Sequence, residues 1–174
     1  MLVTISGLPG SGTSTVAARV AAELGIERLD GGTVFRSLAA ARGLDLAAFS
    51  RLAESDPSID LELDAALAAR ARAGDVVLES RLAGWIATNE QLASVRVWIE
   101  CDPDVRAARV AVRDGIEAVA ARAANEIREA SERQRYAEYY GLDIGDRSIY
   151  DVVVDSVERS PAELSATIVS AAAR

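Results

Sequence analysis

A glycine-rich stretch near the start of the chain, GLPGSGTST at 7–15, holds the residues best suited to chemistry. It follows a short apolar run and precedes apolar residues at helical spacing, and a phosphate-binding loop (P-loop) requires this order of strand, loop and helix. Backbone N–H groups of such a loop, with the helix dipole, bind phosphate oxygens. The predicted nucleotide-binding residues are Gly7, Leu8, Pro9, Gly10, Ser11, Gly12, Thr13, Ser14 and Thr15.

The loop departs from the general P-loop pattern G-x-x-x-x-G-K-[ST] at one position. Gly7, Gly12 and Ser14 match the pattern, but Thr13 stands where the lysine is expected. Threonine can donate a hydrogen bond and brings no positive charge. The alternative reading is therefore an ordinary glycine-rich turn between a strand and a helix.

A nucleotide phosphate chain implies Mg²⁺ as the accompanying cofactor. The Ser14 hydroxyl is the candidate protein oxygen beside the metal, and Thr15 is the next choice. Glu79 ends an apolar run at 76–79, where its carboxylate could hold the water shell of the ion. The other reading of Glu79 is a surface residue at the end of a strand.

Arginines supply the positive charge, because the chain contains no lysine. Their planar guanidinium groups bind phosphate oxygens in a bidentate manner. Arg36 and Arg81 are the strongest candidates, since each follows a predicted strand. The further candidates are Arg109 and Arg113, spaced i, i+4, Arg128, Arg133 and Arg135 in a charged helix, and Arg147 in the loop after it. Each of these could instead belong to a solvated, salt-bridged helix face, as the neighbouring Glu126, Glu129 and Glu132 suggest.

The elements that must position these residues alternate between strand and helix. Apolar runs predict strands at 2–6, 26–29, 76–79, 95–100 and 150–155, with helices at 13–24, 34–42, 46–53, 59–73, 104–113, 119–140 and 162–173. Thr33 is the predicted N-cap of the second helix. This alternation indicates an α/β fold with a five-stranded parallel sheet covered on both faces. Ligands bind at the carboxyl ends of such strands, which places the candidate residues along one edge.

Composition limits the possible classes of protein. A length of 174 residues fits one domain. A net charge of −8 argues against a nucleic-acid partner, and the apolar runs are too short to span a membrane. With Cys101 as the only cysteine and no histidine, we expect no internal disulfide and no structural zinc site. We expect a cytoplasmic monomer.

The motifs together resemble the nucleoside monophosphate kinases, and most closely the short type of cytidylate kinase. The resemblance covers nearly the whole chain. It rests on GLPGSGTST at 7–15, LDGGTVFR at 29–36, VVLESRLAGW at 76–85, RAARVAVRDG at 106–115, EASERQRYAEYYG at 129–141 and SIYDVVVDS at 148–156.

This resemblance implies a three-layer P-loop fold with a helical monophosphate-binding region at 33–73 and a lid at 113–135. It implies that Arg36 and Arg81 bind the acceptor phosphate, and that Asp30 is a further acceptor-binding residue. Arg109 and Arg113 would face the donor phosphates, and three lid residues would reach the transferring group: Arg128, Arg133 and Arg135. The loop after Asp155 would lie near the donor base. The implied reaction transfers a phosphoryl group from ATP to CMP or dCMP.

Two departures leave alternatives open. The long pyrimidine-binding insert of the bacterial type is absent, and Leu82 stands where that type has an aspartate that contacts cytosine. The alternatives are a kinase for another small acceptor, such as AMP, UMP or shikimate, and a nucleotide-binding regulator without turnover. Arginines in several separate segments argue against the regulator, which needs no second anion site.

Overall fold

A parallel five-stranded sheet forms the centre of the molecule, as predicted. The computed structural model describes residues 1–174. The strands are β1 (Leu2–Gly7), β2 (Glu27–Asp30), β3 (Val76–Glu79), β4 (Val95–Glu100) and β5 (Val152–Asp155), in the spatial order β2-β3-β1-β4-β5. All four pairings are parallel, so every strand ends at the same edge of the sheet.

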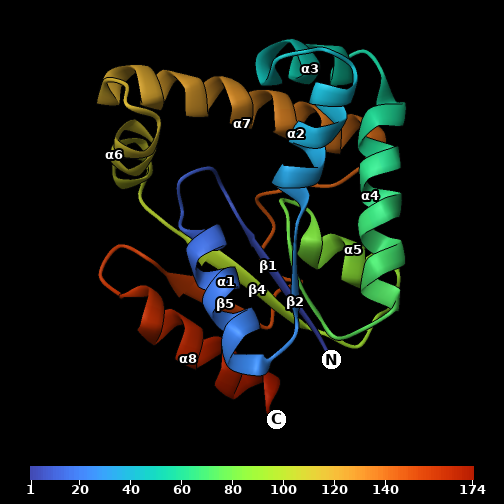
Figure 1. Cartoon of the computed structure of the whole chain (residues 1–174), viewed down its shortest axis with the longest axis vertical. Coiled ribbons are helices and arrows are strands. Elements are labelled where there is room, and N and C mark those ends of the chain that lie inside the picture. Colours follow the sequence, from blue (N-terminus) through green and yellow to red (C-terminus); the bar gives the residue numbers. More distant parts are fainter.

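One face of the sheet is covered by α1 (Thr13–Leu24) and α8 (Pro161–Ala172) (Figure 1). Val16, Val20 and Ile168 pack there against β1 and β4 and are almost fully buried. Ser160 and Glu163 form a capping box at the start of α8, which satisfies N–H groups of its first turn. This layer carries α1, whose N-terminus follows directly from the P-loop.

The other face is covered by α5 (Ala83–Asn89) and by the inner side of α4 (Pro57–Arg72). The sequence did not predict α5, which has only seven residues and includes a glycine. A Cβ at Gly84 would lie 2.5 Å from the ring of Tyr150. That ring packs in turn on Trp98, with centroids 5.4 Å apart. Glycine therefore allows α5 to lie directly against the core.

Three helices between β2 and β3 form a projection with an apolar cluster of its own: α2 (Gly31–Ala41), α3 (Leu46–Ala53) and α4. The rings of Phe35 and Phe49 lie 4.8 Å apart in this cluster. The prediction of Thr33 as N-cap is wrong. Asp30 is the N-cap of α2, because its carboxylate accepts the Gly32 N–H at 2.9 Å and the Thr33 hydroxyl at 2.6 Å.

The last two helices are α6 (Pro103–Asp114) and α7 (Ala118–Tyr140), which meet at a turn through Gly115. Figure 1 shows α7 lying across the top of the molecule, from α6 to the projection formed by α2, α3 and α4. Predicted element ends otherwise agree with the structure to within two residues at most boundaries. No helix combines the length and the apolar character needed to cross a lipid bilayer.

Candidate active site

The P-loop has the tight geometry that its glycines predict. Residues 8–12 join β1 to α1, and Gly10 and Gly12 have φ angles of +84° and +89°, a region that other residues rarely adopt. A Cβ at Gly7 would lie 2.6 Å from the Ser11 hydroxyl. Thr13, only 8% exposed, lies in the first turn of α1 with its methyl group against Gly7. The loop therefore presents backbone N–H groups at the start of a 12-residue helix.

Ser14 and Glu79 come together beside this loop. The Ser14 hydroxyl donates to Glu79 Oε1 at 2.6 Å, and Arg28 donates to the other carboxylate oxygen at 2.7 Å. Glu79 is 5% exposed, so its reading as a surface residue is wrong. Kinases commonly hold Mg²⁺ with one or two protein oxygens, phosphates and water. A hydroxyl and a carboxylate in contact fit an ion held in that way.

Arg36 lies near the end of β2 and is largely exposed. Its guanidinium donates to Thr33 Oγ1 at 2.8 Å and to the Asp30 carboxylate at 3.4 Å. Burial by itself would raise the pKa of Asp30, but the hydrogen bond from Thr33 and the charge of Arg28 outweigh burial and lower that pKa. Asp30 is therefore a charged cap that orients Thr33 and Arg36 toward the sheet edge.

Arg81 joins the P-loop to α7. Its Nη1 donates to the carbonyl oxygen of Gly7 at 2.9 Å, and its Nε donates to Glu132 at 3.0 Å. Arg128 reaches the other oxygen of the same carboxylate at 2.8 Å. Burial would raise the pKa of Glu132, but Arg81 and Arg128 outweigh burial and hold it below its ordinary value. Two predicted phosphate-binding arginines therefore meet at one buried carboxylate.

Arg135 lies about one helical turn after Glu132 in α7 and is 4% exposed. Its Nε donates to Asp60 of α4 at 2.7 Å. Burial raises the pKa of Asp60 above its ordinary value, and the charge of Arg135 offsets only part of this increase. Beside this pair the Tyr140 hydroxyl donates to Asp64 at 2.7 Å, and burial raises the pKa of Asp64 to about 6. These bonds fasten the second half of α7 to α4.

Arg109 lies on the other side of the P-loop. It donates to the carbonyl oxygen of Ser156, just after β5, at 2.6 Å and to the Ser156 hydroxyl at 3.0 Å. That hydroxyl donates to the P-loop carbonyl of Ser11 at 2.8 Å. A cavity of about 180 Å³ is lined here by residues of the P-loop, Arg109, Ser156 and Arg159. Hydrogen bonds therefore connect the P-loop, Arg109 and the chain after β5.

Two predicted site residues are not gathered with the others. Arg113 is exposed and pairs with its neighbour Asp114 at 2.7 Å. Arg133 is exposed and forms no hydrogen bond or ion pair within the chain. At 100° per residue Arg133 also lies on a different face of α7 from Glu132 and Arg135.

Sequence reasoning missed three charged residues: Arg106, Glu132 and Asp60, all of which are buried. In the sequence, Glu132 indicates a solvated helix face. The available signal was the spacing of Arg128, Glu132 and Arg135, which at i, i+4 and i+7 places them on one face of a helix. Nothing local in the sequence marks Asp60 as the partner of Arg135, because that contact is made across two helices.

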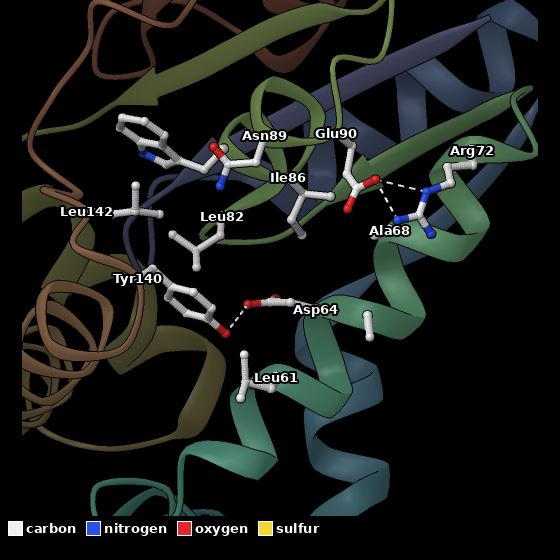
Figure 2. A pocket seen from close by; sticks show the side chains of 12 residues that line it. Leu61, Asp64, Ala68, Arg72, Leu82, Ile86, Asn89, Glu90, Tyr140 and Leu142 are labelled. Carbon is white, nitrogen blue, oxygen red and sulfur yellow. Dashed lines mark hydrogen bonds and ion pairs between the residues drawn. The ribbon is translucent and has the colours of Figure 1, made fainter.

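A second cavity, of about 290 Å³, is a separate groove between α4, α5 and the end of α7. Figure 2 shows Leu61, Asp64 and Ala68 on one side and Leu82 and Ile86 on the other. An ion pair between Arg72 and Glu90 lies at one end, and the Tyr140–Asp64 hydrogen bond lies at the other. None of the predicted phosphate-binding residues lines this groove.

The fold and the loop after β1 are those of the P-loop kinases. A gluconokinase from Sinorhizobium meliloti superposes with a TM-score of 0.63 at 18% identity, covering 99% of this chain and 91% of its own. A shikimate kinase from Acinetobacter baumannii in complex with shikimate superposes with a TM-score of 0.62 at 13% identity, covering 99% and 92%. Within this class the chain belongs to the cytidylate kinase-like family, which it matches over residues 2–158.

Proteins with similar sequences are named cytidylate kinase. A cytidylate kinase from Halobacterium salinarum is 51% identical over 162 residues, which are 92% of this chain and 83% of the relative. A cytidylate kinase from Methanopyrus kandleri is 45% identical over 163 residues, 90% of this chain and 84% of the relative. A cytidylate kinase from Pyrococcus horikoshii is 39% identical over 171 residues, which are 98% of this chain and 88% of the relative. The predicted resemblance is confirmed.

Proposed function

We propose that the protein transfers the γ-phosphoryl group of ATP to CMP and dCMP, giving CDP and dCDP, with Mg²⁺ as cofactor. The observation that carries this proposal is the position of Arg81, which bonds the P-loop at Gly7 and meets Arg128 at Glu132. A second cationic site beside the donor loop is what an enzyme with a phosphate acceptor needs. The choice of a cytidine nucleotide rests on the relatives named cytidylate kinase.

The donor phosphates would be held by the N–H groups of the P-loop and the first turn of α1. Arg109 would add positive charge at the far end of the loop, near Ser156. Thr13 would contribute a backbone N–H and a hydroxyl in place of the missing lysine charge. Ser14 and Glu79 would hold the Mg²⁺, which when bound neutralises part of the phosphate charge.

The acceptor phosphate would lie between Arg36 and Arg81. Arg36 is exposed in the second turn of α2 and already oriented by Asp30 and Thr33, so its guanidinium can receive a phosphate with little reorganisation. Arg81 is held by the loop and by Glu132, which fixes its distance from the donor site. Two guanidinium groups on opposite sides would align the attacking oxygen with the donor phosphate.

The transferring group would be stabilised by arginines of the lid. Arg128 and Arg135 share the face of α7 that carries Glu132, and they are our candidates for contacts made in the transition state. Arg113, which is exposed in α6, would have to approach the site by movement of the lid. Arg133 is not among these candidates, because it lies on a different face of α7. Protein catalysis of this reaction consists of alignment, exclusion of water and positive charge.

A coupled assay of ADP formation with CMP, dCMP, UMP, AMP and shikimate as acceptors tests the proposal. We expect CMP and dCMP to be turned over well above the other three. Equal or faster turnover of AMP, UMP or shikimate would assign a different acceptor. No ADP with any acceptor, together with measurable ATP binding, would favour a nucleotide-binding regulator.

A further inference from the structure

Arg106 is a buried arginine that connects three segments of the candidate site. It lies in the first turns of α6 and is 5% exposed. Its Nη1 donates to the P-loop carbonyl of Pro9 at 3.1 Å, and its Nε donates to the carbonyl of Cys101, just after β4, at 3.3 Å. Both Nη groups also bond the carboxylate of Glu129 on α7. The donors of Arg106 face protein acceptors, so this residue has no role in binding substrate directly.

The backbone of Arg106 contacts the same part of the loop. A Cβ at Gly10 would lie 2.5 Å from the carbonyl oxygen of Arg106, so only glycine allows the loop to approach α6 so closely. The loop at Pro9 and Gly10 is therefore fixed twice, by the Arg106 side chain and by contact with the Arg106 backbone.

This contact determines where one N–H group points. The peptide bond between Pro9 and Gly10 is trans, so the Pro9 carbonyl and the Gly10 N–H point in opposite directions. Arg106 holds the carbonyl on the α6 side, which directs the N–H away from α6. That N–H forms no hydrogen bond within the chain and is free for a ligand. The bond from Arg81 to the Gly7 carbonyl acts on the neighbouring part of the loop in the same way.

Both arginines pair with α7. Arg106 bonds Glu129 and Arg81 bonds Glu132, two carboxylates that are spaced i, i+3 on one helix. Two peptide groups of the P-loop are thus connected through buried arginines to adjacent positions of α7.

We propose that Arg106 is a positioning residue that orients the Pro9–Gly10 peptide toward the donor phosphates and, through Glu129, couples this orientation to the position of α7. The inference rests on the proposed function only in taking a nucleoside triphosphate as the ligand of the P-loop. The competing account is that Arg106 merely holds α6 and α7 together. The two accounts differ in their effect on donor affinity.

Three single variants separate these accounts. Arg106→Lys keeps a positive charge but cannot bridge Pro9, Cys101 and Glu129 together. Glu129→Gln keeps nearly the same shape and removes the charge that holds Arg106. Asp104→Asn is the matched control, because the Asp104–Arg122 ion pair also joins α6 to α7 but does not involve the P-loop.

The measurements are the Kd for ATP by calorimetry, which requires no turnover, and the KM values for both substrates. We expect Arg106→Lys to weaken ATP binding about tenfold and Glu129→Gln about threefold, with the KM for CMP within about twofold of wild type. Asp104→Asn should bind ATP as the wild type does. In the double variant of Arg106 and Glu129, the fold-loss in ATP affinity should be smaller than the product of the fold-losses in the single variants, because the two residues act through one contact.

The inference is overturned if Arg106→Lys, or the milder Glu129→Gln where the lysine variant does not fold, binds ATP normally. It is also overturned if Asp104→Asn weakens ATP binding equally. A protein that binds ATP as expected in all variants but phosphorylates neither CMP nor dCMP would contradict the proposed function and leave this inference standing.

Discussion

The two halves of α7 are held in different ways. The outer half, Ala118–Ile127, leaves Val119 82% and Ile127 73% exposed. Its charges pair at the surface, as Arg122 does with Asp104 and Glu126. The anchored half, Arg128–Tyr140, buries Glu132 and Arg135 and packs against the core and α4. The Tyr139 hydroxyl adds bonds to the carbonyls of Ala53 and Glu54 at 2.9 and 2.8 Å.

This difference between the halves of α7 indicates where a lid could bend. A segment with few buried contacts opens at a lower free-energy cost than one that is packed and hydrogen-bonded. The proposed lid at 113–135 therefore divides near Arg128. Residues before that point can move with the C-terminal end of α6, while Glu132 and Arg135 remain with the proposed monophosphate-binding region at 33–73.

The largest expected effect lies at the ion pair of the anchored half. Arg135→Ala leaves Asp60 buried without its partner, so we expect the free energy of unfolding to fall by about 3–5 kcal/mol. Urea unfolding measures this loss. Arg122→Ala in the outer half should leave the urea midpoint unchanged, since its pairs lie at the surface. Equal losses in the two variants would remove the distinction between the halves.

The next effect concerns activity at the contact between the anchored half and the P-loop. Arg81→Ala removes a guanidinium that bonds Gly7 and Glu132 and faces the proposed acceptor site. We expect the loss in kcat/KM for CMP to correspond to about 2–4 kcal/mol of transition-state binding. Steady-state kinetics measures this loss, and Arg122→Ala is the control variant. A near-normal kcat/KM would exclude Arg81 from the site.

A smaller effect depends on pH. Burial raises the pKa of Asp64 from 3.8 to about 6 in the folded protein, so the folded state binds this proton more tightly than the unfolded state does. The free energy of unfolding therefore falls as the pH rises through this interval and stays lowered above it. Asp64→Asn removes the cost of the buried charge while keeping an acceptor for Tyr140. It should be more stable than wild type by about 1–2 kcal/mol at pH 7.5 and similar to wild type near pH 4. An equal difference at both pH values would contradict the assigned cause.

The smallest effect is a difference in local opening. Amides of the outer half should exchange hydrogen faster than those of the anchored half, and a bisubstrate analogue should slow the outer half by about tenfold. Exchange followed by mass spectrometry resolves the two halves as separate peptides. If the analogue protects only the anchored half, the lid does not bend near Arg128.

The sequence predicted those features that depend on local spacing. Gly7, Gly12 and Ser14 identify the P-loop because the glycines meet steric needs within the loop itself. Thr33 is a residue type favoured as N-cap, but Asp30 caps α2, which begins at Gly31. Local polarity does not reveal which side chain bonds which N–H group.

Features that depend on distant contacts could not be predicted. The helix α5 is not predicted, because Gly84 weakens the helical pattern. A larger residue at this position would collide with the ring of Tyr150, which lies in the loop before β5. Charged residues are mostly exposed, so the burial of Glu132 and Arg135 is not expected from their residue types. Their partners, Arg81 and Asp60, come from other elements, and only the fold brings them together.

Guanidinium groups make up the cationic side of the candidate site, and this has a consequence for the proton balance of the reaction. An arginine does not release its proton within the pH range in which proteins remain folded. The arginines around the P-loop can therefore neither donate a proton to a phosphate nor accept one from it. The second proton of a phosphate monoester, with a pKa of about 6, must then pass to an acceptor other than these arginines. The acid limb of the rate profile would accordingly report the ionisation of the nucleotide, with the arginines acting as a permanent charge.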